Sequence, residues 1–366
     1  AIAVAMSGTA GTNTLNNLAG GVIQAYGANT YAYAVTGDDG VDVINNAGTI
    51  TGDVLTYAGD DKFNNLAGGI WNVAGTMQTD FGDDDDSLSN SGTIWITNGS
   101  IGFGNGDDTA TNNANGLINL SNGLIHMDAG TNTFTNAGKI NVLGHVGNTI
   151  DAGAAGTVFN NGLIEMNTGF TNEALTVAST FGGTTGHLSI DVHQVGLTAD
   201  HLFVNGNVLA NTKQTVDINL APVFPLTAHT SIPFAWVTGT SAAGNFVPGT
   251  IYGYNYPLNF IDLGFTIGSN INTANTASDV FSVNLDVNGL NDTGAIAALT
   301  AQGAANFMNT QMGTFRQRLG VNPYGDAGKV MSAYVRYYST SGDVTPGHLA
   351  NNFGQGGHFN FDQSTW

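Results

Sequence analysis

Polar and apolar positions in the first half of the chain recur as one short unit. Each copy has two polar residues, mostly Asn-Asn, followed by small residues, a Gly and an apolar residue that is mostly Ile. The apolar positions of the seven copies are Ile23, Ile50, Ile70, Ile94, Ile118, Ile140 and Ile164, spaced by 27, 20, 24, 24, 22 and 24 residues. A repeat of this length indicates a solenoid, in which each copy stacks on the one before it.

Short β-rich runs inside the repeats predict that the solenoid is made of strands. Residues 94–96, 117–120 and 139–143 are rich in Ile, Leu and Val and are bounded by Gly, Asn and Asp. No segment of residues 1–290 has a convincing helical period. The pattern therefore predicts an all-β chain folded as a parallel β-helix, with coils stacked at the ~4.8 Å spacing of neighbouring strands. A barrel or a sandwich is the rival architecture. Neither requires the same unit of two polar residues, a small residue and Gly, which we call the tetrad, in every repeat.

Positions within the repeat predict which side chains lie inside. The repeated Ile should point into the core at equivalent positions of successive coils. An Asn at a fixed turn position, Asn113 in the fifth copy, should hydrogen-bond to its equivalent in the next coil. Trp71 and Trp95 each follow a repeated Ile, so we expect them to stack on an outer face of the solenoid.

Composition removes several functional classes. The 366 residues include 27 Asp or Glu and 7 Lys or Arg, which gives a formal net charge of −20. Residues 1–300 contain only Lys62, Lys139 and Lys213 and no Arg, so the basic patch that nucleic-acid binding needs is missing. The chain has no Cys, which excludes a disulfide-stapled scaffold, and its 42% hydrophobic content is enough to build a core.

Acidic turns lie just upstream of the Asn-Asn units and should stack along one edge of the solenoid. They are Gly37-Asp38-Asp39, Gly59-Asp60-Asp61, Gly82-Asp83-Asp84-Asp85-Asp86 and Gly106-Asp107-Asp108. One interpretation is a Ca²⁺-binding ladder, because carboxylates are preferred Ca²⁺ ligands. The other is a solvated edge of Asx turns that keeps the rod soluble. The Gly-Gly-x-Gly-x-Asp nonapeptide of Ca²⁺-binding β-rolls is absent from the sequence.

The sequence changes character after Asn167, where the tetrads stop. Residues 294–320 carry the one amphipathic helical pattern of the chain, and an apolar strand pattern follows at 331–338. Upstream of that helix, further strands are predicted at 188–192, 200–208, 214–220 and 234–239.

The order of these segments resembles a bacterial autotransporter of the type V secretion class. In that family an Asp-x-Leu-x-Val-x-Gly strand, here at 200–206, precedes an aromatic-rich cap of the β-helix. A linker helix and the first strand of a translocator barrel then follow. The resemblance covers nearly the whole chain. It implies a right-handed parallel β-helix passenger with a C-terminal β cap, one linker helix and a truncated barrel stub.

The resemblance divides the chain into four expected parts. These are β-solenoid repeats at 1–167, C-terminal β-helix coils and cap at 168–290, the linker helix at 291–320 and a truncated start of the translocator barrel at 321–366. Residues 330–366 have room for roughly three membrane strands, whereas the smallest barrels need about 8. We therefore expect that the chain does not carry a pore of its own.

Self-cleaving members of the family cut after the first of two adjacent Asn residues in the linker helix. A Met-Gly-x-aromatic-Arg segment follows that pair, and residues 312–316 match it. Asn306 falls at the first Asn, but Phe307 occupies the second, so the pair is broken. We expect no cleavage near Asn306.

Enzymatic chemistry finds no support in the sequence, and we assign no catalytic and no cofactor-binding residue. None of the eight His lies beside a Gly-x-Ser-x-Gly elbow, and residues 85–88 lack the Gly of the Gly-Asp-Ser-Leu esterase signature that they otherwise approach. A β-helix polysaccharide lyase needs an Arg or Lys base. The first Arg of the chain is Arg316, in the linker, so this alternative depends on three scattered Lys residues and is disfavoured.

Three histidines are close enough in sequence to raise the question of a metal site. His187, His193 and His201 lie near Asp191 and Asp200, and imidazole and carboxylate are both metal ligands. We expect surface or cap histidines instead and assign no metal-ligating residue.

The resemblance implies a structural and adhesive function outside the cell. We expect a stiff acidic rod, without enzymatic activity or cofactors, exported across the outer membrane of a Gram-negative bacterium to the cell surface. Its expected partners are glycans or proteins on host or neighbouring cells, or further copies of itself. Nucleic acid is not expected as a partner, and membrane contact is expected only through the missing barrel. Two alternatives stay open: a glycan-active enzyme on the same β-helix, and a self-assembling extracellular filament whose strand edges pair.

Overall fold

The structure is a computed structural model that describes most of the chain up to residue 290. The described residues are 2–8, 11–25, 33–73, 78–144, 147–194, 196–220, 229–253, 261–272, 277–290, 338–344 and 359–365, together with Thr300, Ala304 and Met308. Nearly all of its regular structure is β-strand, which confirms the predicted all-β class.

Three sheets, named A, B and C, contain the strands of the solenoid. Sheet B consists of β2 (Asn13–Asn17), β5 (Asp42–Asn46), β8 (Lys62–Asn65), β11 (Ser87–Asn90), β14 (Thr109–Asn112), β17 (Thr133–Asn136), β20 (Thr157–Asn160) and β23 (Thr180–Gly182). Sheet C consists of β3 (Val22–Gln24), β6 (Thr49–Thr51), β9 (Ile70–Val73), β12 (Thr93–Thr97), β15 (Leu117–Ser121), β18 (Lys139–Leu143), β21 (Leu163–Glu165), β24 (Gly186–His193), β27 (Gln214–Leu220) and β29 (Phe246–Tyr252), with β25 (Thr198–Ala199) beside β24. Sheet A consists of β1 (Ile2–Ala5), β4 (Tyr33–Thr36), β7 (Asp53–Leu55), β10 (Thr79–Asp80), β13 (Ser100–Gly102), β16 (Leu124–His126), β19 (Asn148–Asp151), β22 (Ala174–Val177), β26 (His201–Val204), β28 (His229–Val237), β31 (Asp279–Leu290) and β30 (Ile261–Asn270).

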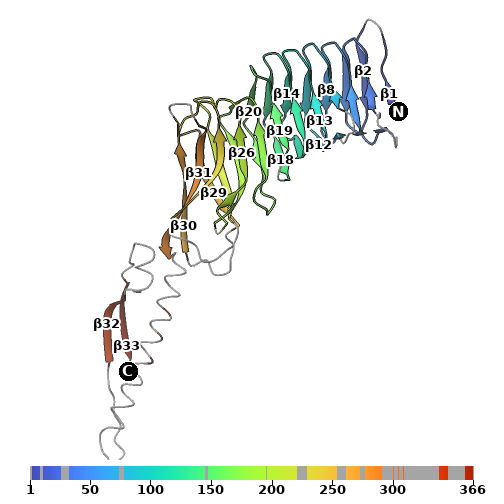
Figure 1. The fold of residues 1–366 in the computed structure, drawn as a ribbon. Helices are drawn as coiled ribbons and strands as arrows, with labels where there is room; N and C mark the ends of the chain where they lie inside the picture. The colour runs from blue at the N-terminus through green and yellow to red at the C-terminus, as the bar shows by residue number, and fades with distance from the viewer. Residues whose placement is uncertain are drawn as a thin grey trace, which may run out of the picture. The chain divides into compact units, whose positions relative to one another are not determined.

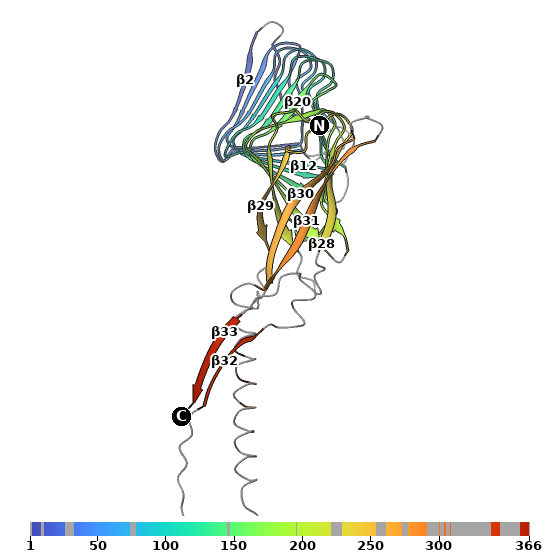
Figure 2. The same cartoon turned by 90° about the vertical axis from the view of Figure 1, so that its left-hand side faces the viewer.

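Each coil passes through one strand of sheet B, then one of sheet C, then one of sheet A. Strands of successive coils pair in parallel, so the chain forms a β-solenoid, as the repeat predicts (Figure 1). The eight strands of sheet B mark eight such coils. In the turned view of Figure 2 the strands of successive coils lie almost over one another. Beyond the eighth coil, Val208 makes a single bridge to Phe181 of β23, and the path continues in sheets C and A as β27 and β28.

Strand alternation explains why the strands of sheet B are polar at both ends and apolar in the middle. In β5, residues 42, 44 and 46 are buried, while 43 and 45 face outward. Successive side chains of a strand point to opposite faces, so the inward set reads Asp42, Ile44 and Asn46. The same inward order of a polar residue, an apolar residue and Asn recurs around β8, β11, β14 and β17. These five sheet B strands thus each bring one apolar side chain and two polar ones to the interior.

The apolar core is a set of side-chain ladders in register. Ile94 pairs with Ile118, and Ile118 with Ile140, and all three are at most 1% exposed. This confirms the predicted interior position of these Ile side chains. Burying a branched aliphatic side chain stabilises a fold by about 1.5–3 kcal/mol, so repeated ladders supply much of the favourable free energy.

The prediction that Trp71 and Trp95 stack on an outer face is wrong. Trp71 pairs with Ile94 and is fully buried, whereas Trp95 pairs with Asn72 and is 40% exposed. Inside the core the Trp71 ring stacks on Phe63, with ring centroids 4.1 Å apart, and its Nε1–H donates to Gly52 O at 3.2 Å. Ile70 is the outward residue instead, with 39% of its surface exposed.

The register of the third copy was ambiguous because it contains two adjacent glycines, Gly68 and Gly69, from which the core position can be counted. The corner glycine is Gly92 in the fourth coil, and the core Ile94 follows two residues later. A Cβ at Gly92 would lie 2.3 Å from Gly69 O and 2.6 Å from Leu66 O, so only glycine fits this close approach. Gly69 stacks at the same corner one coil earlier, and counting two residues from it gives Trp71. Counting from Gly68 gives Ile70, one residue out of register.

The chain falls into two compact units. One comprises Ala1–Leu226, Thr230–Tyr254 and Phe265–Asn284, and the other comprises Thr227–His229, Asn255–Gly264 and Leu285–Trp366. In the second unit β32 (Tyr338–Val344) pairs with β33 (Phe359–Thr365) in antiparallel fashion.

Most of the predicted linker helix and barrel segment lies outside the described residues. Of 291–320 only Thr300, Ala304 and Met308 are described, which is too few to define the helix. Of 321–366 only β32 and β33 are described, so the four-part division of the chain stays a prediction. Within the described part of the chain, no helix has both the length and the hydropathy to cross a membrane.

Candidate functional site

A ladder of buried asparagines runs along the corner between sheets B and C. In each rung the Nδ2 amide of one Asn donates to the Oδ1 of the Asn in the next coil, as from Asn46 to Asn65 at 2.9 Å and from Asn112 to Asn136 at 2.8 Å. The Nδ2 of Asn112 also donates to the carbonyls of Gly116 and Lys139. From Asn46 to Asn160 each amide is therefore both donor and acceptor, and its burial leaves no unpaired polar atom. We call this set the Asn ladder: Asn17, Asn46, Asn65, Asn90, Asn112, Asn136 and Asn160.

The Asn ladder confirms the predicted coil-to-coil asparagine bonds but shifts one member. Asn112 is the rung of the fifth coil, whereas Asn113 donates to the hydroxyls of Ser89 and Ser91 and lies outside the ladder. In this coil the rung is the first Asn of the pair, whereas in the first three coils it is the second Asn: Asn17, Asn46 and Asn65.

Gln214 completes the Asn ladder by reaching across a coil that lacks the asparagine. Gly183 occupies the position above Asn160, as the pairing of β20 with β23 shows. The Oε1 of Gln214 accepts from the Nδ2 of Asn160 at 2.7 Å, and its Nε2 donates to the carbonyls of Asn160 and Gly183. The extra methylene of Gln spans the gap, so the last rung is also fully bonded.

A second buried ladder, made of aspartates, runs along the corner between sheets A and B. Here the backbone N–H of each member donates to the Oδ1 of the member in the next coil, at 2.7 Å from Asp42 to Asp61 and 2.8 Å from Asp61 to Asp86. The series continues to Asp108 at 2.9 Å and ends on Asn132 at 2.9 Å. We call these five residues the Asp ladder.

The Asp ladder leaves a carboxylate oxygen without a donor in each of three coils. The Oδ2 atoms of Asp61, Asp86 and Asp108 are buried and have no hydrogen-bond partner. Burial raises the pKa of Asp61 to about 7, of Asp86 to about 8 and of Asp108 to about 7, because the charged form loses its hydration. Neighbouring carboxylates raise these pKa values further, and the backbone N–H bonds oppose the shift. The acidic turns are therefore not uniformly solvated, since one Asp in each of three of the four turns is in the core.

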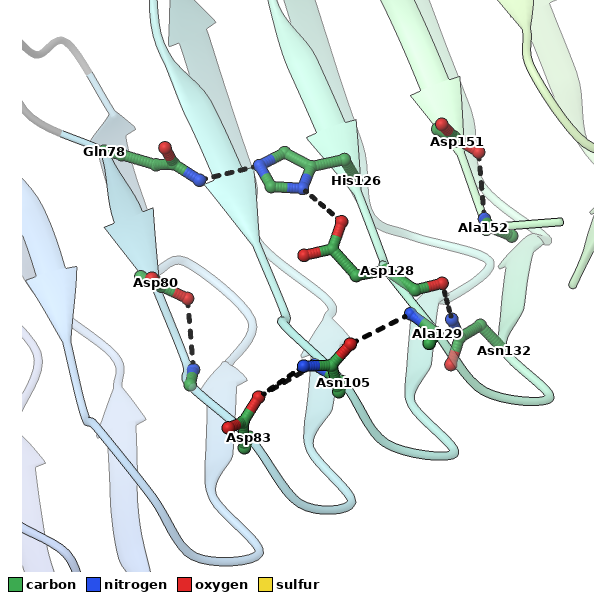
Figure 3. Close-up of polar contacts among 12 residues, drawn as sticks. Gln78, Asp80, Asp83, Asn105, His126, Asp128, Ala129, Asn132, Asp151 and Ala152 are labelled. Atoms are coloured by element: carbon green, nitrogen blue, oxygen red, sulfur yellow. Dashed lines mark hydrogen bonds and ion pairs between the residues drawn. The ribbon is translucent and has the colours of Figure 1, made fainter.

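The outer residues of the acidic turns form an exposed edge of coil-to-coil hydrogen bonds (Figure 3). Asn105 donates from Nδ2 to the Oδ1 of Asp83 at 2.8 Å, and the N–H of Ala129 donates to the Oδ1 of Asn105 at 3.4 Å. The N–H of Asp107 donates to the Oδ1 of Asp85 at 2.8 Å. This arrangement matches the interpretation of stacked Asx turns. Among the described residues, no three acidic or His groups of this edge bring ligand atoms together as a metal site would require.

The same face carries one histidine with an acid behind it. The Nε2 of His126 lies 2.8 Å from the Nε2 of Gln78, and its Nδ1 lies 3.8 Å from the Oδ1 of Asp128 (Figure 3). A hydrolase places a hydroxyl or thiol nucleophile where Gln78 lies. An amide nitrogen is no nucleophile, so this arrangement lacks the reacting group of a catalytic triad.

A groove of about 450 Å³ lies on the outer face of sheet C, across β21, β24, β27 and β29. Asp217 lies 2.7 Å from the Nδ1 of His187 and accepts from the N–H of Thr250 at 2.7 Å. Glu165 forms an ion pair with Lys139. The groove residues are Asn161, Gly162, Leu163, Glu165, Asn167, Thr185, His187, Ser189, Asp217 and Tyr252. The groove thus offers an aromatic ring beside amide, hydroxyl and carboxylate groups that are already oriented.

The three histidines considered as metal ligands from the sequence each have a different partner. His187 pairs with Asp217 in the groove, and the Nδ1 of His193 accepts from the N–H of Gly196 at 3.2 Å. His201 packs edge-on against Trp236, with ring centroids 5.0 Å apart, and burial lowers its pKa. The described residues contain no metal-type cluster that includes any of the three.

Three buried carboxylates converge near the last coils, at the corner between sheets C and A. Glu173 lies just before β22, Asp191 in β24 and Asp200 just before β26. One oxygen of each lies within 4.8 Å of the other two. Burial raises the pKa of both Asp191 and Asp200, and the Glu173 side chain raises that of Asp200 further. We call these three residues the carboxylate cluster.

Sequence patterns contained a signal for the Asp ladder but not for the carboxylate cluster. Asp42, Asp61, Asp86 and Asp108 each precede an inward apolar residue by two positions, and strand alternation turns such a residue inward. Glu173 lies 18 residues before Asp191, outside any repeat, so only the fold brings them together.

Comparisons with known proteins identify no relative: no protein-family model, curated protein or solved structure matches this chain.

Proposed function

We propose that the chain is the adhesive β-solenoid passenger of an autotransporter, displayed at the cell surface, and that its sheet C groove binds neutral glycans. The observation that carries the glycan proposal is the lining of the groove. Tyr252 is half exposed, so its ring is available to a sugar face, and Asn161, Asn167 and Ser189 supply donors and acceptors for hydroxyl groups. A net charge of −20 disfavours anionic partners.

The stiffness of the scaffold also supports an adhesive function. Six of the ten groove residues lie on four strands of one sheet, and ion pairs and backbone bonds hold Glu165, His187 and Asp217 in place. A site on rigid strands loses little conformational freedom on binding, so weak contacts remain useful. The autotransporter assignment itself rests on the sequence resemblance, with the right-handed helix, the C-terminal cap and the truncated barrel as its expected parts.

The enzymatic alternative is weaker at this groove. Glycoside hydrolysis requires one free carboxylic acid and one carboxylate or nucleophile on either side of the bond. Glu165 pairs with Lys139, and Asp217 pairs with His187 and the N–H of Thr250. Both acids of the groove therefore already have fixed partners, and neither stands free beside a bond to be cleaved.

Exposed apolar side chains in the first coils favour the filament alternative as a second candidate. Ile2, Leu18 and Val22 are 55%, 72% and 68% exposed. Apolar side chains beside the edge of a sheet favour pairing with a second chain. Self-association through this end is compatible with glycan binding at the groove.

A glycan array probed with the purified chain tests the proposal. We expect binding to neutral glycans that falls at least about tenfold in Tyr252→Ala, since a stacked aromatic is a dominant contact. Trp95→Ala is the matched control, because Trp95 is a comparably exposed aromatic on the same sheet. Equal losses in both variants, or no binding to any neutral glycan, would contradict the groove assignment. Turnover of chromogenic glycosides would replace it with the enzymatic alternative, and sedimentation velocity would measure self-association.

A further inference from the structure

The carboxylate cluster is the most deeply buried group of converging acids among the described residues. Glu173, Asp191 and Asp200 are 3%, 4% and 0% exposed. Within the described part of the chain none of them forms an ion pair with Lys, Arg or His. Three carboxylates removed from water without a positive partner are costly in free energy.

Hydrogen bonds account for five of the six oxygens in the carboxylate cluster. Asp200 accepts from the N–H of Glu173 at 3.0 Å on Oδ1 and from the N–H of Asp191 at 2.6 Å on Oδ2. Asp191 accepts from the N–H of Gly169 at 2.7 Å on Oδ2 and from the amide of Asn219 on Oδ1. The hydroxyl of Thr168 donates to Oε1 of Glu173 at 2.6 Å.

The sixth oxygen is the independent sign of a ligand. Oε2 of Glu173 is buried and has no hydrogen-bond partner. Every other oxygen of the cluster accepts a hydrogen bond. Oε2 of Glu173 accepts none, so it is free to coordinate a cation. Native proteins rarely leave such an atom without a partner.

We propose that Glu173, Asp191 and Asp200 bind a calcium ion. All candidate ligand atoms of the carboxylate cluster are oxygens, which favours a hard cation over Zn²⁺, because zinc sites draw on Cys and His. Each oxygen that accepts one N–H or O–H keeps a second lone pair for a cation. The donors come from three separated segments of chain, and Ca²⁺ tolerates such irregular geometry whereas Mg²⁺ demands a near-ideal octahedron.

The calcium proposal differs from both expectations drawn from the sequence. From the sequence we expect no metal ligand, and the candidate Ca²⁺ site there is the row of acidic turns. In those turns the acids bond in series along the stack, whereas in the carboxylate cluster oxygens of three residues converge. The proposal does not depend on the proposed function.

The competing explanation is a proton shared between Glu173 and Asp200. A shared proton would satisfy Oε2 and would remove one negative charge. The two explanations differ in their response to added cation, since only a metal site gains stability from Ca²⁺ at constant pH.

The test is thermal unfolding together with isothermal titration calorimetry on the full chain. Because the site is buried, the chain is unfolded in urea with EDTA and refolded with EDTA, Ca²⁺ or Mg²⁺, so that the ion is present as the coils close. We expect saturating Ca²⁺ to raise the thermal midpoint by about 5 °C, Mg²⁺ to have a much smaller effect, and calorimetry to give one Ca²⁺ per chain.

Two variants locate the ion. Glu173→Gln keeps the shape and the bond from Thr168 but removes a charge, and we expect the Ca²⁺ Kd to weaken at least about tenfold. Asp128→Asn is the matched control, because Asp128 is an exposed acid outside the cluster, and its Kd should equal that of the wild type. If Glu173→Gln fails to fold, Asp191→Asn provides the same comparison.

Three outcomes overturn the calcium proposal. The first is an equal thermal midpoint in EDTA and in Ca²⁺ for the wild type, which assigns the cluster to a shared proton. The second is an unchanged Ca²⁺ response in Glu173→Gln, which places the ion elsewhere. The third is stronger stabilisation by Mg²⁺ than by Ca²⁺.

Discussion

The two ends of each sheet B strand solve the same problem with different chemistry. From β5 to β17, the Asn ladder at one end and the Asp ladder at the other each place one polar side chain per coil in the core, with at most 1% exposure. Asn carries a donor and an acceptor, so Asn90, Asn112 and Asn136 bond directly to one another. Asp carries only acceptors when ionised, so Asp61, Asp86 and Asp108 bond through backbone N–H groups and each leaves Oδ2 unpaired.

The comparison shows that the stability of a buried stack is independent of pH only if each side chain carries both a donor and an acceptor for its neighbours. The Asn ladder satisfies its own atoms in every coil and needs no proton. The Asp ladder has the donors it needs only at its ends. Asp42 accepts from Asn13 and from the N–H of Asp38, and Asn132 donates from Nδ2 to the carbonyl of Asp128 at 3.4 Å. Its middle rungs are stable when protonated.

The largest expected effect comes from placing the Asp ladder's residue in the Asn ladder. Asn112→Asp keeps the acceptor for Asn90 but removes the donor to Asn136, and it buries a charge without a partner. We expect a loss of about 3–5 kcal/mol in the free energy of unfolding at pH 8, measured by urea denaturation. The loss should shrink in acid, because a protonated Asp regains a donor. One ordinary hydrogen bond contributes about 1 kcal/mol. A loss smaller than about 1 kcal/mol at pH 8 would therefore show that the Asn ladder does not depend on its donors.

A smaller effect is expected from pH on the Asp ladder itself. The folded pKa values of Asp61, Asp86 and Asp108 are about 7, 8 and 7, above the ordinary value of 3.8. Below about pH 4 both folded and unfolded chains are protonated, and the stability of the neutral ladder is fully present. As pH rises from about 4 to 8 the unfolded chain releases protons first, so stability falls. The measurement is the urea midpoint at pH 5 and at pH 8.5, with the higher midpoint expected at pH 5.

Asp86→Asn isolates the contribution of the Asp ladder from that of other acids. It converts the central rung to the residue found at Asn132, so we expect a gain of about 1–2 kcal/mol at pH 8.5 and less than about 0.5 kcal/mol at pH 5. The gain is well below the full value of the pKa shift because the chain relaxes around a buried charge. Destabilisation of the variant at pH 8.5 would mean that the wild-type carboxylate has a partner, such as a bound cation.

The smallest effect is expected for Asn45→Ala, and its neighbour in the same strand, Asn46, provides the comparison. Asn45 faces outward, donating to Asn16 at 2.9 Å and accepting from Asn64, whereas Asn46 faces inward in the Asn ladder. We expect Asn45→Ala to cost less than about 0.5 kcal/mol and Asn46→Ala about 2–3 kcal/mol, since only the buried site leaves unpaired groups away from water. Thermal unfolding of the two variants side by side measures the ratio. Equal costs would contradict the assigned register.

Much of the coil architecture could be predicted from the sequence because stacking repeats a local pattern. The interior position of Ile118 and the asparagine bonds follow from alternation and period alone. Register failed at Trp71 and Asn113, where a coil has an extra Gly or Asn and several alignments of the repeat fit equally well. The corner glycine settles the register physically, because Gly92 has no room for a Cβ.

The candidate sites were harder to predict because they depend on segments outside the repeat. Tyr252 reaches the groove from β29, more than 80 residues after the last tetrad at Ile164. Glu173 and Asp200 meet only because β22 and β26 are paired. Sequence periodicity carries no information on such contacts, whereas buried charge and orphaned oxygens become visible once the coils are stacked.

The rungs of the Asn ladder have a consequence for how such a protein changes over generations. The side-chain bonds of each rung to other rungs reach only the one before and the one after it. All these rungs carry the same amide, so any two of them are interchangeable partners. Gln214 shows that even a coil without an asparagine is bridged. Duplication or deletion of one whole coil in the gene therefore leaves a continuous stack, and the chain is free to lengthen or shorten in steps of one repeat.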